Sequence, residues 1–340
     1  MIKLEEKKDL SPYNTLRLKA AADYFAIISS EDQLKEALVL AREKKLPIFV
    51  LGGGSNILIS KDIKALVLKN ELKGIELVSE TDEAVYLQAA SGEIWSALVH
   101  HTVDQGWGGI ENLFYVPGTV GAAPVQNIGA YGVELKDVFE SLRAMDLETG
   151  EIIEFNLNDC QFGYRDSVFK NEAKGRYYIL SIKLKLSKKP QLKLDYGDIK
   201  IKLTERGIEA PNVKQVAEII REIRDAKLPN PSVLANAGSF FKNPELATDF
   251  FEKLQIKFPE IKFFPGSKEG LIKIPAGWLI EQSGFKGKRY GDVGMYEKQA
   301  LILVNYGEAS AKDALDHIKR VQAEVENIFG IKIEPEVNII

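Results

Sequence analysis

The stretch from residue 107 to residue 135 constrains the fold more than any other part of the chain. It contains six glycines and two prolines, namely Gly108, Gly109, Gly118, Gly121, Gly129, Gly132, Pro117 and Pro124. Glycine weakens regular structure and proline removes a backbone donor, so this stretch cannot form a regular helix or a central strand. A loop of this length inside a compact domain is usually functional. Its small side chains would let a flat ligand lie against the backbone, while Thr119, Gln126 and Asn127 could hydrogen-bond to that ligand.

Regular elements are expected on both sides of this loop. Apolar residues at helical spacing predict helices near 31–45, 93–105, 212–226 and 310–330. A capping box from Ser30 to Gln33 marks the start of the first helix. The last helix is expected to run from an N-cap at Ser310 to Gly330. Short apolar runs predict strands at 47–51, 65–68, 84–89, 151–156 and 176–187, and the region 229–305 is expected to be rich in strands and loops. These elements predict an α+β protein of two or three domains.

A second glycine cluster follows the strand predicted at 47–51. Leu51 leads directly into Gly52-Gly53-Gly54-Ser55-Asn56. Several exposed backbone N–H groups, a hydroxyl and an amide in one turn could hold a pyrophosphate without a large positive charge. The segment lacks the G-x-G-x-x-G dinucleotide fingerprint, and by itself a tight turn that requires glycine explains it equally well.

Composition limits the chemistry available to the 340 residues. Lys and Arg number 45 and Asp and Glu number 49, which gives a net charge of −4 with both signs mixed along the chain. Small molecules or proteins are therefore expected as partners, rather than nucleic acid or a membrane. The single cysteine, Cys160, and three histidines cannot assemble a usual zinc site. A lone cysteine and an N-terminus without an export signal fit the cytoplasm. Redox chemistry would need a bound organic cofactor.

Short motifs spread over nearly the whole chain agree with one known family. They are Asn14-Thr15-Leu16-Arg17, the glycine turn at 51–56, the loop at 117–132, Tyr164-Arg165-Asp166-Ser167, the segments 236–244 and 276–282, and Glu334-Pro335-Glu336-Val337. In this order they resemble the motifs of the FAD-dependent UDP-N-acetylenolpyruvoylglucosamine reductases of bacterial cell-wall synthesis. That family belongs to the vanillyl-alcohol-oxidase (VAO) type of flavoprotein. So many motifs in register are not expected by chance.

The resemblance implies a two-lobed FAD-binding domain of the PCMH/VAO type and a separate α+β substrate-binding domain. Residues 1–70 would form the first FAD-binding lobe, with residues 335–340 returning near it. Residues 71–228 would form the second lobe and residues 229–334 the substrate domain. The chain length and Tyr196-Gly197-Asp198 resemble the longer, type I form of the family, in which a tyrosine-bearing loop folds over the nucleotide sugar. A monomer is expected.

The resemblance also implies non-covalent FAD, with NADPH as the hydride donor and no metal. His100 and His101 lie outside every flavin-loop motif, so no covalent flavin link is expected. The residues expected to bind FAD come from the first three motifs: Asn14, Thr15, Arg17, Leu51, Gly52, Gly53, Gly54, Ser55, Asn56, Pro117, Gly118, Thr119, Gly121, Ala122, Gln126, Asn127, Gly129, Ala130 and Tyr131.

The implied reaction is the reduction of UDP-N-acetylglucosamine enolpyruvate to UDP-N-acetylmuramate for peptidoglycan synthesis, and hence for cell-wall biogenesis, cell shape, the cell cycle and cell division. A hydride passes from NADPH to flavin N5 and then to C3 of the enolpyruvyl ether, leaving carbanion character at C2. Arg165 would hold the substrate carboxylate, Ser239 would protonate C2, and Glu336 would lie on the other side of the intermediate. The expected substrate contacts are Tyr164, Arg165, Tyr196, Lys227, Ser239, Phe240, Asn243, Gln282 and Glu336.

The same residues also have purely structural interpretations. Arg165 could form an ion pair with Asp166, and Ser239 could cap a turn. Lys227 could complement the carboxyl end of the helix predicted at 212–226, and Glu336 could be a solvated carboxylate.

Two other functions are alternatives. The first is a sugar or alcohol oxidase of the same flavoprotein superfamily, which would use oxygen as the acceptor; the motifs at 164–167 and 236–241 disfavour it. The second is a flavin- or nucleotide-binding protein without catalysis, which the presence of Arg165, Ser239 and Glu336 disfavours.

Overall fold

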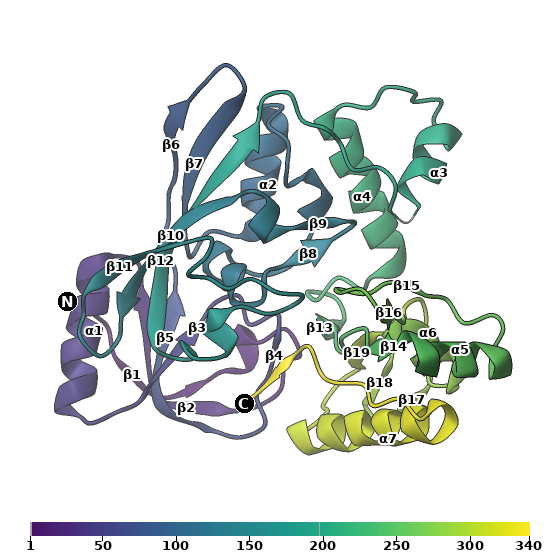
Figure 1. Ribbon diagram of the computed structural model, residues 1–340. Helices are drawn as coiled ribbons and strands as arrows, with labels where there is room; N and C mark the ends of the chain where they lie inside the picture. The colour runs from purple at the N-terminus through teal and green to yellow at the C-terminus, as the bar shows by residue number, and fades with distance from the viewer. Residues whose placement is uncertain (1, 197) are drawn as a thin grey trace. The chain divides into compact units, whose positions relative to one another are not determined.

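The computed structural model describes residues 2–196 and 198–340, so Gly197 of the expected substrate-binding segment lies outside the described residues. The chain divides into two compact units, whose elements are labelled in Figure 1. Unit 1 comprises Met1–Lys8, Ala22–Gly53 and Ile63–Ala226, and unit 2 comprises Asp9–Ala21, Gly54–Asp62 and Lys227–Ile340. The three-part division at 70, 228 and 334 stays a prediction.

The first sheet of unit 1 has the strand order β1-β2-β5-β3, formed by Glu5–Asp9, Ala21–Ile28, Ile63–Asn70 and Ile48–Leu51. β5 pairs in parallel with both β2 and β3, and parallel strands need a crossover such as a helix. Helix α1 (Glu31–Glu43) supplies the crossover from β2 to β3 and buries Leu34 and Leu38 in one core with Leu66 and Leu68. The helix predicted at 31–45 and the strand at 47–51 are confirmed.

The start of α1 differs from the predicted capping box in one detail. Ser30 Oγ accepts a hydrogen bond from the Gln33 backbone N–H at 3.2 Å, as predicted. Gln33 Oε1, however, accepts from the backbone N–H of Ser29 at 2.8 Å. The glutamine side chain therefore caps the residue before the N-cap, because it is long enough to reach past Ser30.

The second sheet of unit 1 is antiparallel, with the order β11-β10-β12-β7-β6. Its strands in that order are Ile152–Asn156, Phe139–Asp146, Tyr177–Ser187, Ala84–Ala90 and Ile75–Glu80. The sequence predicted β11, β12 and β7 but neither β6 nor β10. The β10 sequence FESLRAMD interrupts its apolar residues with Glu140, Ser141 and Arg143, so the alternation typical of a strand is obscured.

Helices α2, α3 and α4 also contribute to unit 1. Helix α2 (Trp95–Asp104) lies within the range predicted for it and ends before Gly106, which has a φ of +73°. Helix α4 (Val213–Lys227) confirms the helix predicted at 212–226. It packs its apolar stripe against Ile199 and Leu203 of α3 (Ile199–Glu205), beside which it runs in Figure 1. Helix α3 was not predicted, because seven residues are too few to show a helical period.

The glycine-rich loop contains only short elements, as its composition predicted. Three single-turn 3₁₀ helices occupy Glu111–Leu113, Val120–Ala122 and Pro124–Gln126. A two-residue hairpin follows, formed by β8 (Gly129–Ala130) and β9 (Val133–Glu134). Val120 and Ala123 contribute to the same core as the antiparallel sheet and α2. The loop is therefore fixed on a packed base.

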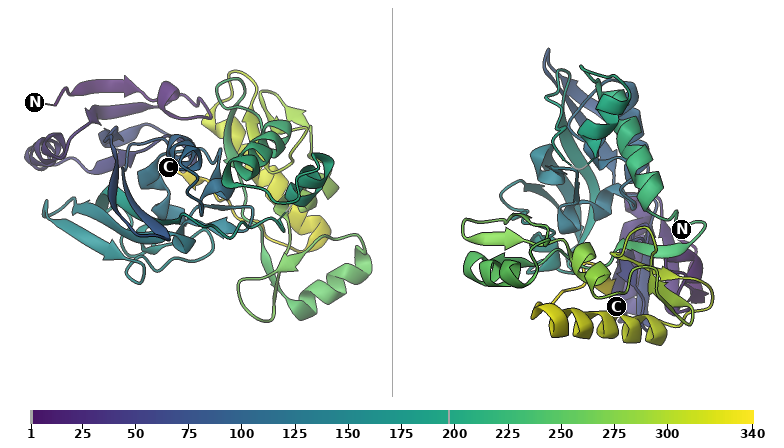
Figure 2. Two further views of the ribbon diagram at one scale, coloured as in Figure 1. Left: turned by 90° about the horizontal axis from the view of Figure 1, so that it is seen from above. Right: turned by 90° about the vertical axis from the view of Figure 1, so that its right-hand side faces the viewer.

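Unit 2 is built on a four-stranded sheet in the order β13-β19-β18-β17, formed by Ala235–Ser239, Ile302–Asn305, Val293–Met295 and Arg289–Tyr290. Two smaller sheets are β14-β16-β15, formed by Glu245–Ala247, Leu271–Lys273 and Phe264–Pro265, and the parallel pair of β4 (Ile57–Leu58) with β20 (Asn338–Ile339). Helix α7 (Ala311–Phe329), yellow in Figures 1 and 2, packs against β18 and α6 (Ala276–Gln282).

Among the helices of unit 2, one was predicted from the sequence and two were not. Helix α7 is confirmed together with both predicted ends: Ser310 and Asp313 form a reciprocal capping box, and Gly330 ends the helix at a φ of +69°. The region 229–305 was expected to hold strands and loops, but it also contains α5 (Thr248–Lys257) and α6. Helix α5 buries only Phe251 and Leu254, so its apolar stripe is too short to recognise.

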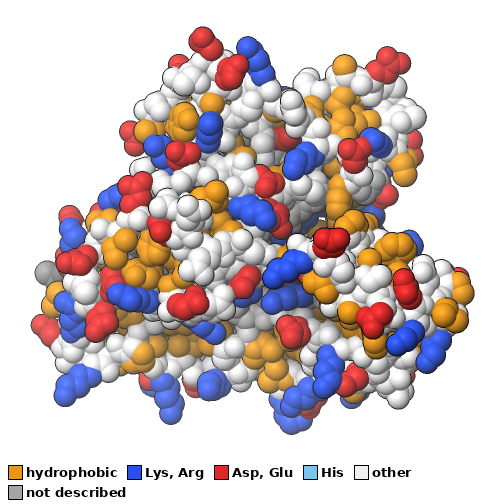
Figure 3. Space-filling model, viewed as in Figure 1, with side chains coloured by type: hydrophobic (Ala, Val, Ile, Leu, Met, Phe, Trp, Pro, Cys, Tyr) orange, Lys and Arg blue, Asp and Glu red, His pale blue; other side chains and the backbone are white. Residues whose placement is uncertain are grey.

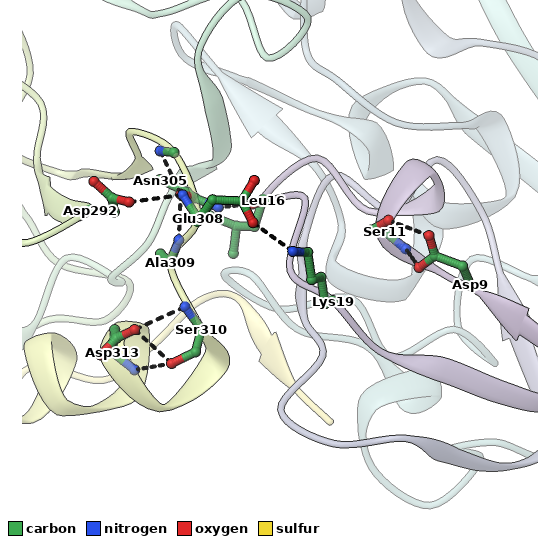
Figure 4. A network of polar contacts seen from close by, with 11 residues as sticks. Asp9, Ser11, Leu16, Lys19, Asp292, Asn305, Glu308, Ala309, Ser310 and Asp313 are labelled. Atoms are coloured by element: carbon green, nitrogen blue, oxygen red, sulfur yellow. Dashed lines mark hydrogen bonds and ion pairs between the residues drawn. The ribbon is translucent and has the colours of Figure 1, made fainter.

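Within unit 2, side chains from residues 305–308 bond to residues 16–19 near the N-terminus of the chain, as Figure 4 shows. Asn305 Nδ2 donates to the Leu16 carbonyl at 2.9 Å, and Asn305 Oδ1 accepts from the Gly307 N–H at 3.0 Å. Lys19 pairs with Glu308 at 2.6 Å on the surface. The buried asparagine matters more than the exposed ion pair, because exposed pairs contribute about 0–1 kcal/mol.

Charged side chains of both signs are interspersed over the face seen in Figure 3. None of the helices in residues 2–196 and 198–340 has both the length and the apolar character needed to cross a membrane.

Candidate functional site

The glycine turn and the glycine-rich loop meet within unit 1. A Cβ added to Gly52 would lie 2.8 Å from Thr119 Oγ1, and one added to Gly53 would lie 3.1 Å from Gly118 Cα. In the part of the chain that the structure describes, the backbone N–H groups of Gly53, Gly118 and Thr119 have no hydrogen-bond acceptor. Thr119 Oγ1 is buried and also lacks a partner there. Such a cluster of unused donors fits an anionic group such as a pyrophosphate.

Gly54 shows why the turn requires glycine at its third position. Its φ is +64°, and an added Cβ would lie 2.0 Å from the Tyr13 carbonyl oxygen within unit 2. The Gly54 carbonyl accepts a hydrogen bond from the Thr15 N–H at 3.0 Å. Any larger residue would push the first and second predicted flavin motifs apart.

Two hydrogen bonds from the Tyr164–Ser167 motif and one to the preceding Gly163 join this segment to the glycine-rich loop in unit 1. Ser167 Oγ donates to the Val125 carbonyl at 2.7 Å, Arg165 Nη2 donates to the Gly129 carbonyl at 2.6 Å, and Asn127 Nδ2 donates to the Gly163 carbonyl at 3.0 Å. The partners are 36 to 42 residues apart in the sequence. Two motifs that the sequence singled out separately therefore form one surface.

Arg165 is held in a strained backbone conformation at this junction. Its φ of +54° is unusual for a residue other than glycine, asparagine or aspartate. A Cβ on Gly129 would lie 2.9 Å from Arg165 Nη1, so a larger residue there would require the guanidinium to shift. The guanidinium also lies 5.6 Å from the centre of the Tyr164 ring. Strain of this kind persists where the surrounding structure enforces it, and it often marks a functional residue.

Tyr131, Tyr196 and Arg224 gather at the other end of the loop. The two tyrosine rings are edge to face, with centroids 6.2 Å apart. Arg224, on α4, hydrogen-bonds the Tyr131 side chain, and burial lowers the pKa of its guanidinium. Arg224 Nε is buried and has no partner among residues 2–196 and 198–340.

Arg224 was not identified from the sequence. A buried guanidinium with spare donors suits an anionic or carbonyl-bearing ligand. The only available signal was an arginine next to Ile223, which belongs to the apolar stripe of α4, and that position alone is typical of a helix surface.

Ser239 and Glu336 come from adjacent hydrogen-bonded segments of unit 2. The Glu336 N–H donates to the Phe240 carbonyl at 2.7 Å, and Phe241 and Pro335 form an antiparallel bridge. Ser239 is exposed at the end of β13, and Glu336 is half-buried. The backbone thus brings the expected proton donor and the expected carboxylate onto neighbouring segments, although they are 97 positions apart in the sequence.

The other expected substrate residues of unit 2 occupy different environments. Asn243 Oδ1 accepts a hydrogen bond from the Ala276 N–H at 2.9 Å and so holds the start of α6. Gln282 is the last residue of α6 and Lys227 the last residue of α4, and both are exposed.

Three residues expected to bind a ligand use their side chains inside the protein. Asn14 donates to the Leu10 and Leu18 carbonyls, and Asn127, at a φ of +45°, bonds to Glu134, Gly163 and Lys136. The Phe240 side chain is fully buried in the core of unit 2. These residues therefore position the motifs, because no polar or exposed part of their side chains is left over.

Arg17 likewise has an internal role. Its guanidinium donates to the carbonyls of Pro231 and Ser232 at 3.0 and 2.5 Å. This links the first motif to the segment before β13 in unit 2, and FAD binding by Arg17 stays a prediction.

Comparisons with known proteins identify the class first. Residues 22–156 match the model of the FAD binding domain. The crystal structure of UDP-N-acetylenolpyruvylglucosamine reductase from Thermus caldophilus aligns with a TM-score of 0.68 at 23% identity, covering 100% of this chain and 98% of that one. 6-Hydroxy-D-nicotine oxidase from Arthrobacter nicotinovorans aligns with a TM-score of 0.51 at 12% identity, covering 98% and 87%. The chain is an α+β flavoprotein with a PCMH/VAO-type FAD-binding domain and a separate α+β domain, as predicted.

The family follows from closer relatives. Residues 230–340 match the model of the UDP-N-acetylenolpyruvoylglucosamine reductase C-terminal domain. The UDP-N-acetylenolpyruvoylglucosamine reductase of Flavobacterium johnsoniae is 47% identical over 340 residues, covering 100% of both chains, and that of Pseudomonas aeruginosa is 46% identical over 338 residues, covering 99% of both. The chain belongs to the UDP-N-acetylenolpyruvoylglucosamine reductase family of oxidoreductases, which confirms the resemblance seen in the sequence.

Proposed function

We propose that this protein uses NADPH and FAD to reduce UDP-N-acetylglucosamine enolpyruvate to UDP-N-acetylmuramate. The observation that carries the proposal is the identity of 47% to a curated reductase along the full length of both chains. The proposed reaction would supply a precursor for peptidoglycan synthesis. Through that pathway it would affect cell shape, the cell cycle and cell division. We place the enzyme in the cytoplasm and expect it to act as a monomer on small-molecule substrates.

The residues of the glycine turn and loop fit FAD. The unused N–H groups of Gly53, Gly118 and Thr119 and the buried Thr119 hydroxyl would hold its pyrophosphate. Gly52 and Gly53 pack closely against Gly118 and Thr119 of the loop. Because both are glycines, no side chain of the turn would separate its backbone N–H groups from a bound FAD. The chemistry that bound FAD supplies is the transfer of a hydride from NADPH to C3 of the enolpyruvyl group.

Arg165 would bind the substrate carboxylate. Negative charge spreads onto that carboxylate as C2 becomes carbanionic, and a guanidinium can bind it through two parallel hydrogen bonds. Its anchoring to the Gly129 carbonyl at 2.6 Å fixes the guanidinium in advance. A preorganised charge of this kind costs little reorganisation when the reaction occurs.

Ser239 would donate the proton to C2, and Glu336 would orient the groups around it. A hydroxyl is a very weak acid, which suits a strongly basic carbon that exists only transiently. Ser239 is exposed rather than buried in its turn, so its hydroxyl is accessible to a ligand. Tyr164, Tyr196, Lys227 and Gln282 would bind other parts of the nucleotide sugar.

The decisive experiment follows the two half-reactions separately in stopped flow with the FAD-loaded protein. Ser239→Ala should leave the bleaching of FAD by NADPH unchanged and should slow reoxidation by the enolpyruvyl substrate about 100-fold or more. Ser79→Ala, at an exposed position on β6, is the matched control and should behave as the unmodified protein. Normal reoxidation in Ser239→Ala would reject the role of Ser239.

The oxidase alternative is tested with the same reduced protein. Mixing it with air-saturated buffer and with anaerobic enolpyruvyl substrate compares the two acceptors directly. The proposed function requires reoxidation by the enolpyruvyl ether to be much faster. Faster reoxidation by oxygen would instead support a sugar or alcohol oxidase.

A further inference from the structure

A cavity of about 530 Å³ lies in unit 1 beside the carboxyl end of α1. Its apolar floor includes Leu38, Leu46 and Ile48, and the turns at 147–148 and 174–176 complete its wall. Ile48 is the first residue of β3, whereas the glycine turn follows the last residue of that strand. Four residues of strand separate these positions by about 13 Å. The cavity is therefore distinct from the FAD-binding surface.

The polar part of this lining is strongly basic. Arg42, Lys45, Lys174 and Arg176 line the cavity, and Glu148 is the one acidic residue among its lining side chains. The chain as a whole carries a net charge of −4, so the cavity differs in sign from the rest of the molecule. Asp146, paired with Arg176, and Glu148 in the lining offset two of these four charges, and the remaining excess of positive charge favours an anionic ligand.

The two arginines are fixed in place by the protein. Arg42 Nη2 donates to the Glu148 carbonyl at 2.6 Å. Arg176 Nε donates to the buried carboxylate of Asp146 at 2.9 Å, and its guanidinium lies 5.2 Å from the centre of the Tyr177 ring. Each contact uses only part of a guanidinium, which has five N–H donors. The arginines are thus preorganised and retain donors for a ligand.

The two lysines have no such anchor. Neither Lys45 nor Lys174 forms an ion pair or a side-chain hydrogen bond in the described ranges 2–196 and 198–340. Both are exposed at the edge of the cavity, so they can move to meet a bound anion. Two fixed and two mobile cations fit a doubly charged group such as a phosphate monoester.

The carboxyl end of α1 is capped at this position. The Lys45 N–H donates to the Arg42 carbonyl at 3.1 Å and the Leu46 N–H to the Ala41 carbonyl at 2.8 Å, so these two carbonyls near the helix end are satisfied internally. Lys45 occupies the left-handed position that usually carries glycine, at a φ of +52°. A lysine there is strained, and it places a cationic side chain at the edge of the cavity.

We propose that this cavity, hereafter the Arg42–Arg176 cavity, binds a small phosphorylated molecule that also has an apolar or aromatic body. The four cations would surround the phosphate, and the floor formed by Leu38, Leu46 and Ile48 would receive the apolar part. The site is additional to the flavin and substrate sites of the proposed function and does not depend on that function.

Phenyl phosphate is the probe, because it joins a phosphate dianion to an aromatic ring. Isothermal titration of the FAD-loaded protein should show one saturable event. Lys45→Glu/Lys174→Glu should weaken it at least tenfold. Lys61→Glu/Lys214→Glu, which reverses two exposed lysines outside the cavity, is the control of equal net charge and should stay within twofold of the unmodified protein. Inorganic phosphate should bind at least fivefold more weakly, because it cannot use the apolar floor.

Several results would overturn the proposal. Absence of saturable binding at millimolar phenyl phosphate would reject the site. Equal weakening by both double variants would show general electrostatic attraction, and no weakening by either would place the binding elsewhere. Equally tight binding of inorganic phosphate would reject the ligand class. Because all four lysines are exposed, circular dichroism and the flavin absorbance spectrum should be unchanged, which verifies that each variant is folded.

Discussion

His317 on α7 should make the stability of unit 2 depend on pH. Its side chain is 1% exposed and lies among aromatic rings, with centroids 5.8 Å from Phe285 and 5.3 Å from Tyr290. Neither ring nitrogen has a hydrogen-bond partner among the described residues. Burial, with a smaller contribution from the charge of Arg320, lowers the pKa of His317 from 6.5 to about 4.

The sign and size of the effect follow from proton linkage. The unfolded chain binds a proton at His317 below about pH 6.5, whereas the folded chain does so only near pH 4. Stability is therefore present above pH 6.5 and is lost as the pH falls towards 4. Each tenfold difference in proton affinity is worth 1.36 kcal/mol, so the full loss is about 3.4 kcal/mol, of which about 2 kcal/mol falls between pH 7 and pH 5.

The assay is urea unfolding followed by far-ultraviolet circular dichroism at pH 7 and pH 5. His317→Leu keeps the apolar packing and removes the titrating group, so it should lose about 2 kcal/mol less than the unmodified protein over this interval. His100→Gln, whose parent side chain is 66% exposed, is the control and should keep the original pH dependence. The reasoning is refuted if His317→Leu loses as much stability between pH 7 and pH 5 as the unmodified protein.

Four further predictions concern other parts of the molecule. Gly54→Ala should destabilise by at least about 2 kcal/mol and weaken FAD binding, because of its φ of +64° and the 2.0 Å approach to Tyr13; an unchanged unfolding midpoint would contradict this. Tyr178→Phe should stabilise by about 1 kcal/mol in urea unfolding, because the buried Tyr178 hydroxyl lacks a partner among the described residues. Cys160 should react with a thiol reagent only on unfolding, since burial raises its pKa to about 12. Arg165→Lys should slow reoxidation by the enolpyruvyl substrate at least tenfold without altering FAD bleaching, because lysine cannot bind a carboxylate through two parallel donors.

The Thr119 hydroxyl and Arg224 Nε are both buried without a hydrogen-bond partner among the described residues, which should link the stability of the protein to ligand binding. Buried donors without partners normally cost stability. Both residues contact motifs that the sequence assigned to flavin or substrate binding. We therefore expect FAD and substrate to raise the unfolding temperature, because they would complete these hydrogen bonds as well as add binding free energy.

Local signals in the sequence determined the elements whose causes are local. Helix α7 was predicted with both ends, because a serine and an aspartate three residues apart and a terminal glycine define a helix by themselves. The irregular loop around residue 120 was predicted for the same reason, since glycine and proline restrict the backbone wherever they occur. The motif order was also sufficient to indicate the family.

Tertiary structure decided which of the named side chains remain available to a ligand. From the sequence, Asn127 is a plausible hydrogen-bond donor to a ligand, but in the folded chain its amide bonds to Gly163 and Glu134. Arg224 is a candidate only in the folded chain, where its Nε is buried without a partner among the described residues. The proximity of Ser239 to the Glu336 segment likewise depends on a backbone hydrogen bond between distant residues, from Glu336 to Phe240. A sequence specifies which donors and charges a chain carries. Whether they are used internally depends on long-range neighbours, because hydrogen bonding and desolvation are set by distances that only the folded chain defines.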